Sequence, residues 1–370
     1  LTAQARLQLA SAGEATPRVE VIDPAALAAL PEPNPGDLFF DFEGDPLFRA
    51  GERGGRTEWG IDYLFGLVDT QARFTALWAH TLAEEKQALR DFLDLVAARR
   101  ALDPGLKIYH YAAYERVHLS SIAARHGEGE AEVDALLREH VLVDLYPIVR
   151  RALRVGSRSY SIKKLEPLYM GADLRDEDGV TSGGQSISEY ADARELLASP
   201  DAADRAEGQR RLDAIADYNE YDCRSTLRLR DWLRARAAEH GVTPYPAELV
   251  DRGTPPLVES ETAAGLARHG VAEAGEARSP EQTAAALASA AIDYHAREHK
   301  AFWWAHFARL VDPVEDWAST RDVLVVDPEL SGVVQDWHLP AGKRVARRVL
   351  RLDGEIAPGS SLKSGEVFAL

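Results

Sequence analysis

One short segment limits the possible folds of this chain more than any other. Residues 38–43 read Leu-Phe-Phe-Asp-Phe-Glu, a composition typical of a β-strand, and the Gly-Asp-Pro at 44–46 predicts a turn that ends it. Because side chains alternate along a strand, Asp41 and Glu43 are predicted to share one face, with apolar side chains on the other. Neighbouring carboxylates in an apolar strand repel each other and lose hydration unless a cation binds both. The segment therefore predicts either a metal-binding strand or an edge strand with a solvated polar face.

The residues that follow alternate between strand-like and helix-like segments. The apolar spacing and the turn residues predict, in chain order, an antiparallel hairpin (61–68 and 74–78), an amphipathic helix (82–100), a strand (106–111), a helix (114–126), a strand leading into a helix (141–153) and a long helix (202–239). A stretch rich in glycine and acidic residues predicts a loop over 171–184. This order predicts an α/β fold in which a mixed sheet is flanked by helices.

The length of 370 residues is enough for two or three domains, each with a core of its own. We expect an N-terminal helix and linker over 1–36 and the α/β domain over 37–241. A linker and an amphipathic helix are expected over 242–310. A small β-rich module, which we expect to be incomplete, follows over 311–370, with strands near 322–326, 331–334, 344–352 and 366–370.

Composition excludes several classes of protein. Cys223 is the single cysteine, so neither an internal disulfide nor a cysteine-rich zinc cluster can form. No uninterrupted apolar run approaches the ~18 residues of a membrane span, and no signal peptide is recognised, so we expect a cytoplasmic location. The formal net charge is −17, from 60 acidic and 43 basic residues, which argues against tight non-specific binding to phosphate backbones.

Two further segments place candidate chemistry on predicted helices. Tyr218 and Asp222 are four residues apart and therefore share a helix face, where Asp222 could bind a hard cation and Tyr218 could position a water molecule. Glu115 lies in the first turn of the helix 114–126, five residues after His110. Alternatively, Tyr218 could lie on an ordinary helix surface. The Glu115 carboxylate could serve only to cap its helix, because the helix dipole favours a negative charge in the first turn.

Taken together, these segments resemble the DEDDy exonucleases of the ribonuclease H-like fold, which carry Asp-x-Glu on the first strand and Tyr-x-x-x-Asp on a late helix. More closely, the chain resembles the ribonuclease H-like domain found in bacterial fusions of a RecB-type nuclease with a superfamily 1 helicase. The segments that carry this resemblance are residues 41–46, 160–166, 218–226 and 294–304.

The resemblance implies a metal-dependent nuclease that removes nucleotides from a 3′ end. It implies that Asp41, Glu43, Glu115 and Asp222 bind two divalent cations, Mg²⁺ or Mn²⁺, and that Tyr218 orients the attacking water. The implied substrate is nucleic acid, with a single-stranded 3′ end first. The implied partners are fused or associated RecB-type nuclease and helicase domains of a longer protein. No membrane partner is expected, because the sequence has no apolar run long enough to span a membrane.

The second motif departs from the family pattern. Glu115 stands where the family has aspartate, and His110 stands where it has asparagine, which changes a hydrogen-bonding partner near the substrate. Asp144 is a weaker candidate for the same ligand position, with a structural role as its alternative. Lys163 and Lys164 are candidates for contact with a substrate phosphate, or else they begin a solvated helix.

Alternative functions remain open at this point. The departures at the second motif and the negative charge favour an inactive nucleic-acid-binding or docking module of the same larger machine. More remotely, His295-x-x-Glu298-His299 matches an inverted zinc-peptidase pattern, with Glu355 as a distant third ligand. The basic segment 342–351 could contact nucleic acid, and the aromatic residues within 303–307 could stack on bases or fill a core.

Overall fold

The computed structural model describes residues 2–53, 56–175, 183–244, 260–271, 278–292, 294, 323–339 and 346–356. Contacts divide the chain into two compact units: Leu1–Asp251 with Asp312–Leu370, and Arg252–Val311. The first unit contains Asp41, Glu43, Glu115, Tyr218 and Asp222, the candidate catalytic residues.

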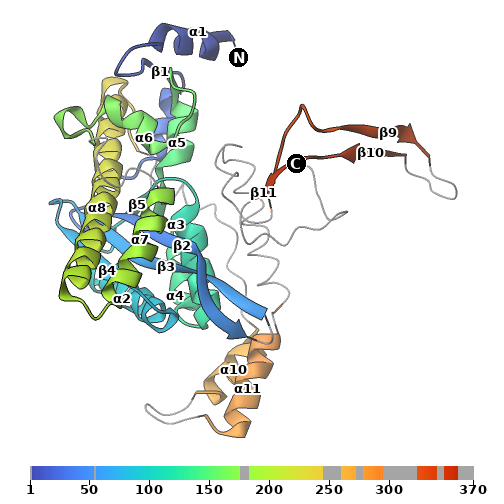
Figure 1. Ribbon diagram of the computed structural model, residues 1–370. Helices are drawn as coiled ribbons and strands as arrows, with labels where there is room; N and C mark the ends of the chain where they lie inside the picture. Colours follow the sequence, from blue (N-terminus) through green and yellow to red (C-terminus); the bar gives the residue numbers. More distant parts are fainter. Residues whose placement is uncertain are drawn as a thin grey trace. The chain divides into compact units, whose positions relative to one another are not determined.

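A five-stranded sheet forms the centre of the first unit, in the order β4-β3-β2-β5-β6 (Figure 1). Adjacent strands among β2 (Leu38–Arg53), β3 (Arg56–Asp69) and β4 (Phe74–Trp78) pair antiparallel, whereas β5 (Ile108–His110) and β6 (Leu142–Asp144) continue the sheet in parallel from β2. The central strand is therefore the one that carries Asp41 and Glu43. This mixed sheet, flanked by helices, confirms the predicted fold class.

Strand β2 continues past the Gly-Asp-Pro segment that was predicted to end it. Its pairing with β3 shifts register between Glu43 and Gly44, again between Asp45 and Arg49, and once more before Gly51. Pro46 has no N–H to donate to the ladder, and it falls inside the second of these irregular steps. The prediction of a turn at this point was wrong. Gly44 and Pro46 lie at β-bulges, where the register shifts while the two strands stay paired.

Helices cover both faces of the sheet. On one face, α2 (Leu82–Leu102), α3 (Tyr114–His126) and α4 (Glu130–Arg138) share a buried apolar cluster with β2 and β3. On the other face, α5 (Leu145–Ala152) and the long α8 (Ala202–Glu239) enclose a second cluster, and α7 (Gly183–Leu197) packs along α8 (Figure 1).

The side chains of β2 alternate between these two faces as predicted. Leu38, Phe40 and Phe42 belong to the cluster beneath α2 and α3, whereas Phe39 belongs to the cluster beneath α8. Because Asp41 and Glu43 share the parity of Phe39, their side chains leave β2 on the side of α8. The buried aromatic side chains on the opposite face anchor the strand that carries the two carboxylates.

Helix α8 can approach the sheet closely because β3 has a glycine where the two elements meet. A Cβ atom on Gly66 would lie only 1.5 Å from Oδ1 of Asn219 on α8. The Cys223 thiol, one helical turn further on, donates to the Gly66 carbonyl over 3.3 Å. The close contact fixes the height of α8 above β2, and with it the position of Asp222.

The first 36 residues are more structured than the predicted helix and linker. Helix α1 (Thr2–Ser11) is present, and β1 (Val19–Val21) pairs antiparallel with β7 (Leu153–Val155), which follows α5. A 3₁₀ turn over Pro24–Ala29 buries Leu27 within the cluster beneath α8.

The short elements near the site are α6 (Ile162–Leu165) and two 3₁₀ turns at Glu166–Leu168 and Gly171–Asp173.

Later parts of the chain form small local structures. In the second unit, α10 (Glu261–His269) and α11 (Pro280–Ala291) pack as a helical pair, and Ser289 Oγ donates to the Ala263 carbonyl over 2.8 Å. Two antiparallel pairs follow, β8 (Leu324–Val326) with β11 (Gly354–Ile356) and β9 (Gly332–His338) with β10 (Arg347–Arg351). The first three strands predicted here are present, the fourth lies outside the described residues, and β11 was not predicted.

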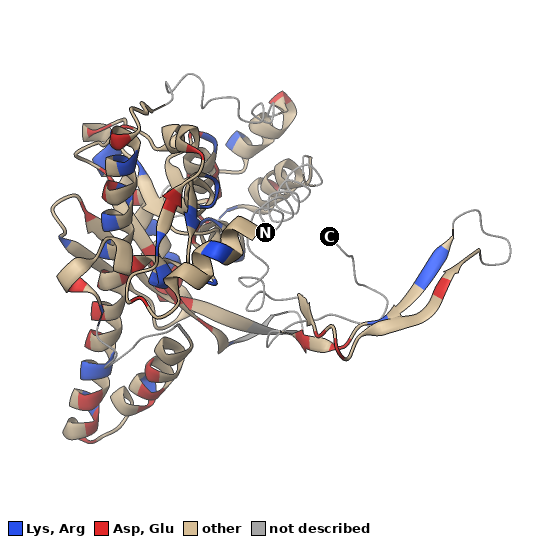
Figure 2. Ribbon diagram, turned by 90° about the horizontal axis from the view of Figure 1, so that it is seen from above, with Lys and Arg blue, Asp and Glu red and all other residues tan. Residues whose placement is uncertain are grey.

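Charged residues are interspersed rather than segregated, and many acidic and basic side chains pair locally. Figure 2 shows acidic and basic positions mixed along the helices around the sheet. Within the basic segment near the C-terminus, Arg348 pairs with Asp336 over 3.1 Å and Arg351 with Asp353 over 2.8 Å. Among the described residues, none of the helices has the length and apolar character needed to cross a bilayer.

Candidate metal centre

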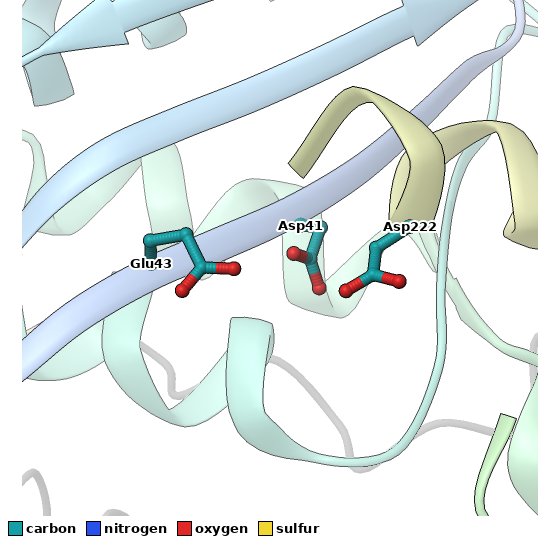
Figure 3. A group of neighbouring side chains, drawn as sticks. All are labelled: Asp41, Glu43 and Asp222. Atoms are coloured by element: carbon teal, nitrogen blue, oxygen red, sulfur yellow. The ribbon is translucent and has the colours of Figure 1, made fainter. Parts of the chain in front are cut away.

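Three carboxylates converge between the central strand and the long helix. Asp41 and Glu43 on β2 and Asp222 on α8 each offer an oxygen within 4.8 Å of the others (Figure 3). Glu43 and Asp222 are buried, and Asp41 is half-buried. The sequence predicted that all three belong to one site, although Asp41 and Asp222 are 181 positions apart in the chain.

Neighbouring polar groups hold two of these carboxylates in place. Asn219 Nδ2 donates to Asp41 Oδ2 over 2.9 Å. The hydroxyl groups of Ser186 on α7 and Tyr63 on β3 hydrogen-bond to Glu43, and the two hydroxyl oxygens lie 2.6 Å apart. The cluster is thus built by four elements, β2, β3, α7 and α8.

The electrostatics of the cluster indicate closely spaced negative charges that the nearby Lys163 compensates only in part. Desolvation, followed by the charges of Asp222 and Glu115, raises the pKa of Asp41 well above its usual range. Desolvation and then the charge of Asp222 raise the pKa of Glu43 to about 8. A divalent cation among these oxygens would offset both the desolvation of the carboxylates and the repulsion between them.

Glu115 does not belong to this group of three. Its Oε2 lies 3.2 Å from Nδ1 of His110, and both side chains are buried. Nδ1 of His110 lies closer, at 2.7 Å, to the Ala112 carbonyl oxygen. Burial by itself would lower the pKa of His110, but the Glu115 carboxylate, the charge of Asp144 and the Ala112 carbonyl more than offset it, so that the pKa is raised. The Glu115 carboxylate therefore lies beside the cluster and contacts His110. Its negative charge contributes to the raised pKa of Asp41.

Asp144 has a different task from Glu115. It begins α5 as the N-cap residue, and its Oδ1 accepts from the N–H groups of Tyr146 and Ala112, both over 2.9 Å. Ala112 has a φ of +71°, so this hydrogen bond helps to hold an uncommon backbone conformation between β5 and α3. Asp144 thereby shapes the loop that leads to Glu115.

Tyr218 lies one helical turn before Asp222 and is buried beside the cluster. Lys163 on α6 donates from Nζ to the Tyr218 hydroxyl oxygen over 2.7 Å. Desolvation and the charges of Asp222 and Glu43 raise the pKa of Tyr218 far above its usual value, so the phenol keeps its proton at neutral pH. Desolvation lowers the pKa of Lys163. Lys164 is exposed, and its backbone N–H donates to the Ser161 carbonyl over 2.9 Å.

A further charged contact was not predicted at all. Arg175 contacts Asp222 and also Glu166, which is buried at the end of α6. Desolvation by itself would lower the pKa of Arg175, but the charges of Asp222 and Glu166 outweigh it and raise the pKa. Residue 175 lies in the segment 171–184 that was predicted to be a loop, where no periodic pattern indicates a partner.

The chain was compared with models of known protein families. The family model RNase_H_2, of the RNase_H superfamily, matches residues 38–234. The chain belongs to the RNase H superfamily. Comparison with curated proteins gave no match, and comparison with solved structures gave none either.

The matched region of this RNase H superfamily member begins at the first residue of β2 and ends within α8. It therefore contains all three clustered carboxylates together with Glu115 and Tyr218. Membership indicates nuclease-type activity on nucleic acid, and nucleases of this superfamily use divalent metal ions, for which the acidic cluster is suited.

Sequence reasoning missed several residues that this superfamily domain uses to hold its cluster. Asn219 lies within the segment 218–226 that carries the family resemblance, and its spacing of three from Asp222 predicts that both share a helix face. Ser186 and Arg175 carried no such signal. The peptidase pattern at His295, Glu298 and His299, and the aromatic residues within 303–307, lie outside the described residues.

Proposed function

We propose that this chain hydrolyses phosphodiester bonds of nucleic acid with the help of divalent cations, and that it removes nucleotides from a single-stranded 3′ end. The observation that carries the proposal is the convergence of Asp41, Glu43 and Asp222 beside Tyr218 within an RNase H superfamily domain. We further propose that the domain works in a longer protein with RecB-type nuclease and superfamily 1 helicase partners.

The residues of the cluster fit Mg²⁺ or Mn²⁺. Their donors are carboxylate oxygens, which are the ligands that these hard cations prefer. Among the described residues, Glu115 Oε2 is buried and lies 3.2 Å from His110 Nδ1 without a hydrogen bond of good geometry, so it could serve as a further cation ligand near Asp41. Asp41, Glu43 and Asp222 would hold the first ion, and Glu115 would join them for a second.

Bound divalent ions would supply an activated water molecule and stabilise charge on the phosphate and on the departing 3′ oxygen. The residues of the chain then have separate tasks. Tyr218 keeps its proton and orients the water as a hydrogen-bond donor, since its oxygen already accepts from Lys163. Lys163 holds the phenol in place and brings positive charge to the phosphate, and His110 holds Glu115.

Hydrolysis of end-labelled oligonucleotides tests the proposal. Single- and double-stranded DNA and RNA, labelled at either end, are incubated with Mg²⁺ or Mn²⁺ and the wild-type chain, the Asp41→Asn variant or the Asp94→Asn variant. Asp94 is exposed on α2, on the opposite face of the sheet, and serves as the matched control. We expect stepwise loss of nucleotides from the 3′ end with the wild type and Asp94→Asn, and at least a ~100-fold slower rate with Asp41→Asn.

Two outcomes would contradict the proposal. Equal rates for Asp41→Asn and the wild type would place the chemistry elsewhere. Binding of oligonucleotides without hydrolysis by the wild type, at any metal concentration, would favour the alternative of an inactive nucleic-acid-binding or docking module.

A further inference from the structure

Arg175 forms ion pairs with two carboxylates, one inside the candidate metal centre and one outside it. One terminal nitrogen, Nη2, contacts Oδ1 of Asp222 and lies 2.9 Å from Oε1 of Glu166. Its Nε donates to Oε2 of Glu166 over 3.2 Å, so that Glu166 receives the guanidinium at both of its oxygens. Glu166 is not part of the three-carboxylate cluster, whereas Asp222 is.

The guanidinium is fixed from several sides. Its central carbon lies 4.4 Å from the centre of the Tyr221 ring and 5.2 Å from that of Tyr218. The backbone N–H of Arg175 donates to the Tyr221 hydroxyl over 2.9 Å. Ser225 Oγ donates to Glu166 over 3.3 Å, which holds the far carboxylate in turn. Only 16% of the Arg175 side chain is exposed, so little water screens its charge.

This arrangement has an electrostatic consequence for the cluster. Arg175 engages one oxygen of Asp222 and leaves the other for a cation. Its positive charge opposes a cation at Asp222, while the negative charge of Glu166 partly cancels that opposition. In a poorly solvated site, a unit charge at this range changes the binding constant of a divalent ion by about tenfold or more.

We propose that Arg175 is a positioning residue whose charge, balanced by Glu166, holds Asp222 as a one-oxygen ligand and sets the affinity of the cluster for its divalent cation. The inference rests on the proposed function only in requiring that the cluster binds such a cation. The same arginine supports the ring of Tyr218, so it links the strength of cation binding to the placement of the group that orients water.

A cycle of charge-changing variants tests this role. Mn²⁺ binding to the full chain is measured from the electron paramagnetic resonance signal of free Mn²⁺, for the wild type, Arg175→Gln, Glu166→Gln and the double variant. We expect Arg175→Gln to bind Mn²⁺ about tenfold more tightly, because the opposing charge is gone, and Glu166→Gln to bind about tenfold more weakly. The double variant restores the net charge and should bind within about threefold of the wild type.

Hydrolysis by the same samples provides a second readout. Arg175→Gln should bind Mn²⁺ more tightly yet turn over more slowly, by about tenfold or more, because Asp222 and Tyr218 lose a fixed partner. A residue with a merely structural role would weaken binding and turnover together. Equal or weaker Mn²⁺ binding by Arg175→Gln, or unchanged binding by Glu166→Gln, overturns the proposal.

Arg175→Lys covers the case in which Arg175→Gln does not fold. It keeps the charge and loses the two-pronged contact, so Mn²⁺ affinity should stay within about threefold of the wild type while turnover falls. If the Mn²⁺ affinities follow the expected order but the wild type hydrolyses no nucleic acid, only the proposed function is contradicted. Hydrolysis by the wild type with equal affinities in every variant contradicts only the role of Arg175.

Discussion

Asn219 on α8 donates its side-chain N–H to Oδ2 of Asp41 on β2 over 2.9 Å, although 178 residues separate them along the chain. The bond ties the helix that carries Asp222 to the strand that carries the other two carboxylates of the cluster. It also occupies one oxygen of Asp41 and so directs the other toward the cluster.

Replacing Asn219 by alanine should therefore weaken both the fold and the candidate metal centre. Asn219 is fully buried, and its removal leaves Asp41 Oδ2 without this donor. We expect a loss of about 1–3 kcal/mol in the free energy of unfolding and a ~10- to 100-fold loss in Mn²⁺ affinity. Chemical denaturation and Mn²⁺ titration measure the two effects. Gln209→Ala, at an exposed position of the same helix, should change stability by less than about 0.5 kcal/mol.

The close approach of α8 to β3 predicts that Gly66→Ala is severely destabilising. The added methyl group would meet Asn219 Oδ1 at 1.5 Å, so helix and strand must separate. We expect a cost of about 3 kcal/mol or more, measured by thermal or chemical unfolding. Gly184→Ala in α7 is the matched control, because a Cβ there meets nothing within 4 Å and should be neutral or stabilising. Similar melting temperatures for both variants would contradict the packing described for α8.

Tyr218→Phe separates the hydroxyl group from the ring. The ring would still contact Lys163 and Arg175, whereas the acceptor for Lys163 and the donor to water would be gone. We expect turnover to fall by about 10- to 100-fold while Mn²⁺ affinity stays within about threefold of the wild type. Single-turnover hydrolysis and Mn²⁺ titration provide the comparison. A large loss of Mn²⁺ binding would instead assign the hydroxyl a role in holding the cation.

The raised pKa of Glu43, about 8, predicts how stability and cation binding depend on pH. In the metal-free protein the folded state holds a proton that the unfolded state releases above about pH 4.5, so the stability contributed by this group falls as pH rises toward 8. Cations bind the deprotonated carboxylate, so their affinity should rise over the same interval.

The measurement is the increase in melting temperature that Mn²⁺ causes. It should be larger at about pH 8.5 than at about pH 6, because fewer protons compete for the carboxylates. Glu43→Gln should bind more weakly and lose part of this pH dependence, with the remainder due to Asp41, whose pKa burial also raises. A Mn²⁺ effect that is the same at both pH values in the wild type would mean that Glu43 is already ionised at the lower pH.

Much of the candidate site followed from local sequence patterns. The alternation of residues 38–43 placed Asp41 and Glu43 on the face opposite Phe40 and Phe42, and the burial of those two rings confirms it. A spacing of four placed Tyr218 and Asp222 on one face of α8. The hairpin of β3 with β4 and the helices α2, α3 and α8 also lie where periodicity predicted them.

Other features had no local signal. The metal-ligand role predicted for Glu115 stays a prediction, because the structure pairs its side chain with His110 and leaves it outside the group of three. Arg175 lies in a segment that was predicted to be a loop, and Ser186 lies in α7, a helix that was not predicted. The continuation of β2 past Pro46 depended on β3, which remains paired with it through the bulges.

The local sequence predicts which side chains share a face, because the periods of the strand and of the helix are properties of the local backbone. It thereby determined the orientation of Asp41, Glu43, Tyr218 and Asp222 relative to their own elements. Which groups meet depends on tertiary packing: Asn219 contacts Asp41 where Gly66 leaves room, and Arg175 contacts both Asp222 and Glu166. Such contacts depend on how closely elements distant in the chain can pack, and on how buried charges find partners once water is excluded.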